Sequence, residues 1–400
     1  MDLRSHSPYW LLKNGLPNTY PSLQQNCRTD IVVMGTGISG ALTGWHLAKA
    51  GFSVIFLDKR HAAMGSTAAS TALLQYEIDE PMHRLIELRG EKAAVRSYQY
   101  CAEAIETLEK ICKRLGRANA FCRRPSLQYA SFKSHVPQLE KEYHLRKKHG
   151  FRLAFLDAAG VEKTMGFAAP AALLSELGAE VDAYQLAHQL LADAVRMGAT
   201  VYDNTEVTAM QATKNGVQLQ TRSGYEVRCR ELVIACGYES QQYIPQQIQT
   251  LHATYAALSE PLPAWEPWYQ RCLIWETAQP YLYMRTTSDN RILVGGLDDD
   301  FYAPAKRDAR IPAKTRRLVA AVQKKFPQLH FLPDFQWAGT FASTRDGLPY
   351  IGRIRQRPHT HFALGFGGNG ITFSLIAAEM IRDHILGKKN PDQEIFSFNR

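Results

Sequence analysis

Hydrophobic and polar positions follow a pattern at residues 30–60 that predicts a βαβ unit. An apolar run at 31–34 leads into a G-x-G-x-x-G turn at 35–40. Apolar side chains then recur at helical spacing over 38–48, and a second apolar run follows at 54–57. The pattern therefore predicts a strand, a glycine-rich turn, a helix and a second strand, in that order.

The turn, together with the acid that ends the second strand, predicts a dinucleotide site. Gly35 permits a tight turn, Gly37 lets a pyrophosphate approach the backbone, and Gly40 lets the helix pack close to the sheet. The helix N-terminus would offer free N–H groups and a positive dipole end to the phosphates. Asp58 would accept hydrogen bonds from both ribose hydroxyls, which argues against NADP. FAD and NAD both remain open at this point.

Helices and strands are expected to alternate along the rest of the chain, after an irregular segment at 1–29. Helices are predicted at 82–117 with a break near Gly90, and at 136–149, 184–197, 310–326 and 371–386; strands are predicted at 126–130, 153–156, 173–177, 231–236 and 362–364, with a hairpin at 281–296. The 136–149 helix is highly charged and is expected to be solvated. A second glycine-rich turn at 365–370 precedes the last helix, whose N-terminus could stabilise a negative charge.

Length and composition limit the class of protein. A chain of 400 residues exceeds the size at which one core keeps growing, so two domains are expected. With 45% hydrophobic and 21% charged residues, the chain is typical of a globular, soluble protein. No apolar run is long enough to span a bilayer, and residues 1–29 lack the apolar core of a signal peptide. We therefore expect a cytoplasmic protein with no membrane partner.

The distribution of charge and the cysteines do not indicate a specific binding or metal site. The net charge of +9 is spread over short clusters without interleaved aromatic residues, which argues against a nucleic-acid face and leaves anionic substrates or RNA as the alternative. The 7 cysteines include no C-x-x-C pair, so reduced thiols and no metal site are expected. The oligomeric state stays open.

Several motifs occur in an order that resembles one family. They are the first glycine turn, GSTAASTALL at 65–74, ELVIACG at 231–237, W-x-G-x(4)-T-x-D-G-x-P-x-I-G at 337–352 and GFGGNGI at 365–371. The chain resembles the flavin-dependent amine and amino-acid oxidoreductases typified by D-amino-acid oxidase, glycine oxidase, sarcosine oxidase and γ-glutamylputrescine oxidoreductase. Its opening Ser7-Pro8-Tyr9-Trp10 is most similar to the γ-glutamylputrescine-type branch.

The resemblance implies an α/β fold in which a Rossmann-type FAD-binding domain is interleaved with an α+β substrate domain. The substrate domain would be built on a mixed or antiparallel sheet. The implied division assigns 1–75, 180–245 and 335–400 to the FAD-binding domain, and 76–179 and 246–334 to the substrate domain.

The resemblance also implies which residues hold FAD. The pyrophosphate and ribose would be held by Gly35, Gly37, Ile38, Ser39, Gly40, Asp58, Lys59 and Arg60. The phosphates and the flavin edge would be lined by Ser66, Thr67, Ser70, Thr71 and Leu73. Glu206 and Val207 would meet the adenine, and Ala235, Cys236 and Gly237 would pass the pyrophosphate. The flavin pyrimidine end and the motif before it would contribute Thr344, Asp346, Gly347, Gly368, Asn369, Gly370, Ile371 and Thr372.

Positions at which this family carries carboxylate-binding charges differ in this chain. Glycine oxidase-like sequences have an arginine where this chain has Phe341, and sarcosine oxidase-like sequences have basic residues in place of Gln75 and Thr372. A buried α-carboxylate would have no partner, which is costly. We therefore expect an amine substrate without a carboxylate on the reacting carbon, such as a secondary or long-chain amine.

Arg285 leaves an alternative open. In this family the strand carrying Tyr283 and Arg285 crosses above the flavin, so Tyr283 is expected in the pocket. If Arg285 points inward, it would clamp a carboxylate from another direction, and the enzyme would be an amino-acid oxidase or dehydrogenase. If it points outward, it is a hairpin arginine in solvent. The expected catalytic set is Gln75, Tyr283, Arg285, Asn369 and Thr372, of which the last two would stabilise reduced flavin.

The implied activity is that of an FAD-dependent amine oxidase or dehydrogenase acting on CH–NH or CH–NH2 groups. A hydride would pass to flavin N5, and water would hydrolyse the resulting imine. FAD is expected to be non-covalent, because no cysteine occupies position 339 and no histidine lies at 65–70. The 291–294 strand lacks a lysine that some oxidases use with O2, so O2 and another acceptor both remain open. An NAD dehydrogenase, an FAD enzyme acting on modified tRNA, and a non-catalytic FAD-binding protein also remain open as functions.

Overall fold

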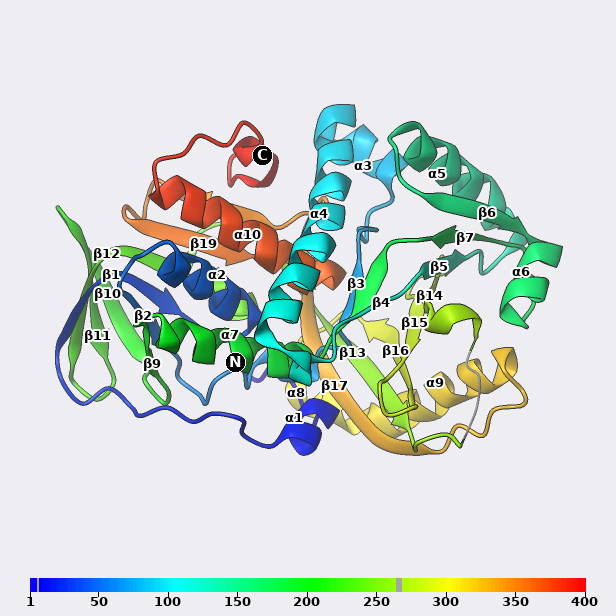
Figure 1. The fold of residues 1–400 in the computed structure, drawn as a ribbon, viewed down its shortest axis with the longest axis horizontal. Coiled ribbons are helices and arrows are strands. Elements are labelled where there is room, and N and C mark those ends of the chain that lie inside the picture. Colours follow the sequence, from blue (N-terminus) through cyan, green and yellow to red (C-terminus); the bar gives the residue numbers. More distant parts are fainter. Residues whose placement is uncertain (6, 264–267) are drawn as a thin grey trace.

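Two large sheets and the helices that cover them make up the two halves of the molecule (Figure 1). The structure is a computed structural model that describes residues 1–5, 7–263 and 268–400. Residues 264–267 belong to the predicted substrate domain and lie outside the described residues. The helix α4 (Glu91–Leu115) runs between the two halves.

The first sheet has eight strands and contains the predicted βαβ unit. Its strands are β1 (Cys27–Met34), β2 (Val54–Leu57), β9 (Thr200–Tyr202), β10 (Val207–Thr213), β11 (Gly216–Thr221), β12 (Glu226–Ile234), β18 (Tyr350–Arg353) and β19 (Thr360–Leu364). β1 pairs in parallel with β2 and β12, and β12 pairs in parallel with β19. The last four residues of β1 and all of β2 are buried, as expected for parallel strands covered on both faces.

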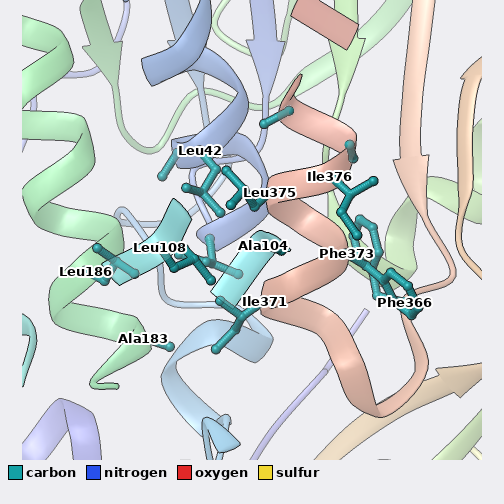
Figure 2. Packing of buried hydrophobic residues seen from close by; sticks show 14 of the residues in the cluster. Leu42, Ala104, Leu108, Ala183, Leu186, Phe366, Ile371, Phe373, Leu375 and Ile376 are labelled. Carbon is teal, nitrogen blue, oxygen red and sulfur yellow. The ribbon is translucent and has the colours of Figure 1, made fainter. Parts of the chain in front are cut away.

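Four helices pack together over this sheet. They are α2 (Ile38–Lys49), α7 (Ala183–Arg196), α10 (Gly370–Ile385) and the central α4. Leu42 of α2, Leu108 of α4 and Leu375 of α10 gather in one apolar cluster, shown in Figure 2. Burying one such leucine stabilises the fold by roughly 2 kcal/mol, so the cluster fixes α2 and its preceding turn against the sheet.

The second sheet also has eight strands, in the order β17-β13-β16-β15-β14-β5-β7-β6. Its strands are β5 (Ser126–Tyr129), β6 (Leu153–Asp157), β7 (Ala171–Ser175), β13 (Thr250–Ser259), β14 (Leu273–Glu276), β15 (Leu282–Thr286), β16 (Ile292–Asp299) and β17 (Pro333–Ser343). The pairing is antiparallel except between β14 and β5, so the sheet is mixed. The helix α9 (Ile311–Lys325) packs on β13, β16 and β17. The expected α/β fold class with a mixed second sheet is confirmed.

Shorter elements join the two halves. A three-stranded sheet is formed by β3 (Leu73–Gln75), β8 (Gly178–Glu180) and β4 (Cys122–Arg123). The remaining α-helices of the described residues are α1 (Tyr9–Asn14), α3 (Met82–Arg89), α5 (Val136–Lys148), α6 (Ala158–Met165) and α8 (Pro304–Ala309). None of the helices within the described ranges has the length and apolar character needed to cross a bilayer.

Three expectations about these elements need correction. The N-terminal segment is not wholly irregular, because residues 9–14 form the helix α1. From the sequence we expect Tyr9, Trp10, Leu11 and Leu12 to dock onto a domain as an arm, and the buried Trp10 donates its indole N–H to the Ser70 carbonyl at 2.6 Å. α5 is not simply a solvated helix, because it buries an ion pair between Glu142 and Arg146 at 2.8 Å. The predicted domain boundary at 335 falls inside β17, a strand of the second sheet.

Candidate active site

The first glycine turn is shaped by close backbone contacts. Gly35 has φ +99°, and a Cβ added there would lie 2.5 Å from the Ala235 carbonyl oxygen. A Cβ on Gly40 would lie 1.8 Å from the Gly35 carbonyl oxygen. The glycines therefore allow β1 to turn directly into α2 while α2 stays close to the sheet. The first N–H of α2, on Ile38, donates to the Thr67 hydroxyl at 3.0 Å.

Asp58 is fixed at the end of β2, facing the same turn. One carboxylate oxygen accepts the N–H and the hydroxyl of Thr36 at 2.8 and 2.6 Å, and the other accepts the Arg60 N–H at 2.9 Å. Burial raises the pKa of the Asp58 carboxyl, while the hydrogen bonds from Thr36 and Arg60 oppose that rise. The carboxylate is held in one orientation, and it lines the cavity described next.

A cavity of about 850 Å³ extends from this first turn to the second glycine-rich turn and collects residues from both large sheets. The predicted cofactor residues that line it are Gly35, Gly37, Ile38, Ser39, Asp58, Lys59, Arg60, Ser66, Thr67, Ser70, Thr71, Leu73, Glu206, Val207, Ala235, Cys236, Gly237, Gly368, Gly370 and Ile371. Of the predicted catalytic residues, Gln75 and Tyr283 line it.

Other predicted residues lie behind the cavity wall. They are Gly40, Arg285, Thr344, Asp346, Gly347, Asn369 and Thr372. The Asn369 amide donates to the carbonyls of Gln75 and Glu77 at 3.1 and 2.8 Å, and the Thr372 hydroxyl donates to the Asn369 carbonyl at 2.9 Å. These two side chains therefore hold the second glycine turn against β3. The Asp346 carboxylate is occupied by an ion pair with Arg400 at 2.9 Å.

Arg285 is neither in solvent nor on the cavity wall. It is 2% exposed, donates to the Thr71 carbonyl at 2.7 Å and pairs with Glu180 at 3.3 Å. Its guanidinium also lies 5.5 Å from the ring centroid of Trp10. Arg285 therefore neither points into the cavity nor faces solvent, the two orientations expected from the sequence. The reason is that α1 and β8 cover this end of β15 and supply partners from distant parts of the chain.

Several groups at the end of the cavity near the second turn were not expected from the sequence. The Tyr281 hydroxyl donates to Asp79 Oδ1 at 3.2 Å, and the Gly368 N–H donates to Asp79 Oδ2 at 2.7 Å. Tyr281 and Asp298 line the cavity, and Asp298 Oδ1 is buried without a hydrogen-bond partner in the described part of the chain. Tyr281 lies two residues before Tyr283, so alternation along a strand would place both side chains on the same face. Asp298 is the first of three acids that follow an apolar strand. Both features can be seen in the sequence.

Burial raises the pKa of several groups at this end. The pKa of Asp298 rises to about 7 because burial outweighs the influence of Thr254 and Lys314. The pKa of Tyr283 rises to about 12, also through burial first and then through the charge of Asp298. These groups are therefore poorly solvated, as in a site that excludes water.

Opposite charges gather at the other end, near the first turn. Lys59 and Arg60 both pair with Glu239, at 2.8 and 3.1 Å. Burial alone would raise the pKa of Glu239, but these partners hold it at about 2. The two ends of the cavity therefore differ in charge pairing, because the basic side chains pair with Glu239 at this end, whereas Asp298 at the other end has no ion pair among the described residues.

Comparison with known proteins identifies the family of this chain. The sequence model of the family described as FAD dependent oxidoreductase (DAO) matches residues 30–384. The chain belongs to this family. The expected resemblance to flavin-dependent oxidoreductases is confirmed.

Relatives of this FAD-dependent oxidoreductase cover most of its length. Gamma-glutamylputrescine oxidoreductase of Escherichia coli (strain K12) is 26% identical over 380 residues, which cover 92% of this chain and 86% of that protein. The crystal structure of glycine oxidase from Geobacillus kaustophilus has a TM-score of 0.78 at 20% identity, covering 94% of this chain and 99% of that one. The crystal structure of L-proline dehydrogenase from P. horikoshii also has a TM-score of 0.78 at 20% identity, covering 93% and 97%. At such identities these structures show a shared fold.

The cradle of this FAD-dependent oxidoreductase fits its cofactor. The turn leaves no room for a Cβ at Gly35 or Gly40. The N-cap residue Gly37 has no side chain, so apart from the Ile38 N–H, which donates to Thr67, the N–H groups of the first turn of α2 can face a pyrophosphate. Asp58 presents a fixed carboxylate beside the turn. The cavity then continues to the second turn, where α10 begins at Gly370.

Proposed function

We propose that this FAD-dependent oxidoreductase oxidises the C–N bond of an amine whose reacting carbon carries no carboxylate. One observation carries the proposal. Among the described residues that line the cavity, those contributed by β13, β15, β16 and β17 include no arginine or lysine. A carboxylate bound against this sheet would lose its hydration without gaining a cationic partner, which is costly.

The positions expected to carry a carboxylate clamp support the same proposal. Phe341 lines the cavity with an aromatic ring, and the centroid of this ring lies 5.1 Å from the centroid of the His252 ring. The Gln75 amide donates to the Ser126 hydroxyl at 3.1 Å, so it is turned toward the protein. The guanidinium of Arg285 is bound by Glu180 and the Thr71 carbonyl. A neutral or cationic substrate matches this wall better than an anionic one.

The names of relatives favour C–N chemistry. Similar proteins include a gamma-glutamylputrescine oxidoreductase and glycine oxidases, whose names refer to amine and amino-acid substrates. FAD, when bound, supplies the acceptor for the hydride that leaves the carbon next to nitrogen. The chain contributes orientation and exclusion of water, since Tyr281 and Tyr283 lie with ring centroids 5.8 Å apart on the cavity wall. The imine that results would then be hydrolysed by water.

A pair of matched compounds tests the proposal. N-methylethylamine and sarcosine differ in whether the reacting carbon carries a methyl group or a carboxylate. We expect anaerobic holoenzyme to lose its visible flavin absorbance with N-methylethylamine, or with longer N-alkyl amines and polyamines, at least tenfold faster than with sarcosine, glycine or proline. Readmission of air then shows whether O2 restores the absorbance or another acceptor is needed.

Two outcomes would contradict the proposal. Faster bleaching by the amino acids would mean that a cation not seen on this wall binds the carboxylate. Absence of bleaching by every amine would mean that the cavity serves a different substrate class.

A further inference from the structure

Asp298 is directed into the cavity by an irregularity of the second sheet. The ladder between β13 and β16 shifts register between the pairs Ala253–Asp299 and Tyr255–Gly296. One residue of β13 therefore faces two residues of β16, Leu297 and Asp298, which is a β-bulge. Leu297 has φ +56°, a left-handed conformation that branched and bulky residues rarely adopt. A strained bulge that re-aims one side chain is typical of functional sites.

Two tyrosines line the same cavity as this carboxyl group, and burial, together with its charge, raises the pKa of both. Tyr283 pairs across the ladder with Gly295, where an added Cβ would lie 2.5 Å from atoms of the tyrosine side chain, so the glycine leaves the space that this ring occupies. Tyr281 is tilted 54° to Tyr283, and its hydroxyl is held by Asp79. A carboxylate and tyrosine rings that line one cavity are groups that can together bind an organic cation.

The carboxyl oxygen Oδ1 of Asp298 has no hydrogen-bond partner among the described residues, although it is buried. Neighbouring acids differ in this respect. Asp79 accepts the Gly368 N–H and the Tyr281 hydroxyl, and Asp299 is paired with Lys314 and Arg310, both at 2.9 Å. Thr254 is the hydrogen-bonding neighbour that lowers the pKa of this carboxyl group, and it does not supply a donor to every oxygen. A buried carboxylate oxygen without a donor is costly, and a ligand that supplies the missing donor would remove this cost.

We propose that Asp298, with the rings of Tyr281 and Tyr283, binds the ammonium group of a cationic amine and accepts its proton before oxidation. This inference rests on the proposed function and specifies the charge state of its substrate. The substrate N–H bond breaks, its electron pair stays on nitrogen, and the proton forms an O–H bond at Asp298 Oδ1. The neutral amine then has the lone pair that its oxidation requires, and the proton later passes to solvent.

The charges around Asp298 fix the direction of its pH dependence. Burial is the largest influence and raises its pKa, a hydrogen bond from Thr254 lowers it, Asp79 and Asp299 raise it further, and Lys314 lowers it, which gives a pKa of about 7. Tyr281 and Tyr283 stay neutral in this range because their own pKa values are raised. The carboxylate is charged above its pKa and neutral below it, so cation binding should weaken as the pH falls through about 7.

A matched pair of probes tests the cation site without turnover. Choline carries a quaternary ammonium group that has no lone pair to oxidise, and 3,3-dimethyl-1-butanol is its neutral carbon analogue. We expect wild-type holoenzyme at pH 8 to bind choline about tenfold more tightly than the alcohol, as measured by calorimetry or by the shift of flavin absorbance. Asp298→Asn should abolish this preference, and Asp300→Asn should keep it, because the Asp300 side chain is 94% exposed.

The wild-type protein alone provides a second readout if Asp298→Asn does not fold. Its preference for choline should be lost as the pH falls from 8 to 5.5. A preference retained in Asp298→Asn, or retained at pH 5.5, would overturn the inference. If no amine bleaches the flavin while choline binding still depends on Asp298, the proposed function fails and the cation site stands.

Discussion

Tyr283 and Arg285 lie two residues apart on β15 and have different surroundings. The Tyr283 ring lies on the cavity wall, whereas Arg285 lies behind the wall residue Thr71, near Trp10 and beside Glu180. Alternation along a strand predicts that both point to the same face. Alternation does not predict which residues of that face line the cavity, because this depends on α1 and β8, which are distant from β15 in the chain.

Replacing Arg285 with methionine should affect stability more than substrate binding. The variant leaves Glu180 buried with Arg124 as its remaining ionic partner, at 2.9 Å. We expect the free energy of unfolding to fall by about 1–3 kcal/mol, because Glu180 loses one of two ionic partners and the Thr71 and Val181 carbonyls lose a donor. Denaturant unfolding of the holoenzyme measures this loss, and amine concentrations for half-maximal flavin reduction should change less than about twofold.

Arg230→Met provides the control for this prediction. The Arg230 side chain is 72% exposed and pairs with Asp30 at 3.5 Å, so its loss should cost less than about 1 kcal/mol. Unchanged stability of Arg285→Met together with weakened substrate binding would show instead that the guanidinium contacts the substrate.

At the scale of elements, the two glycine-rich turns differ in how they are supported. The first turn is held by backbone contacts between β1, α2 and the residues after β12. The second turn, which includes Gly367 and Gly368, is held by Asp79, since a Cβ on either glycine would lie within 2.8 Å of a carboxylate oxygen of this residue. The spacing of glycines in the sequence predicted both turns. Only the first turn lies within a full motif of strand, glycine turn, helix, second strand and terminal acid.

Replacing Gly40 with alanine should release the cofactor. The added methyl group would meet the Gly35 carbonyl oxygen at 1.8 Å, so α2 or the turn must shift. We expect the purified variant to contain less than about a tenth of the wild-type FAD and to lose about 1–3 kcal/mol of stability, a typical cost of overpacking. The absorbance ratio of flavin to protein measures the first effect.

Gly160→Ala is the matched control, because Gly160 lies inside α6 and the nearest atom to an added Cβ would be the Asp157 carboxylate oxygen, at 3.2 Å. Alanine is favoured over glycine in a helix, so FAD content should be unchanged. Full FAD content in Gly40→Ala would show that the turn tolerates a wider separation of α2 from the sheet.

At the scale of the whole molecule, the cavity exists because the chain leaves the first sheet and returns to it. Strands β9–β12 and β18–β19 rejoin β1 and β2 after excursions through the second sheet. The wall facing the cofactor cradle therefore comes from β13, β15, β16 and β17.

This arrangement predicts that FAD is held without a covalent bond. Gly339 and the residues of 65–70 that line the cavity offer no cysteine or histidine. Among the described residues, Cys236 is the cysteine on the cavity wall, and burial raises the pKa of its thiol, which suppresses the reactive thiolate. We expect denaturation to release FAD and to leave a polypeptide of 45.0 kDa by intact-mass measurement. FAD that remained with the polypeptide would contradict this prediction.

The sequence by itself determined the βαβ unit, the positions of most helices and strands, and the residues expected around the cofactor. These features depend on residues that are close together in the chain. They are the local periodicity, the conformational freedom of glycine and the position of Asp58. Only the tertiary structure decided the partners of Arg285, the bulge at Leu297 and the burial of Asp298. Each of these depends on contacts between elements far apart in the chain, and charge and burial are set by such contacts.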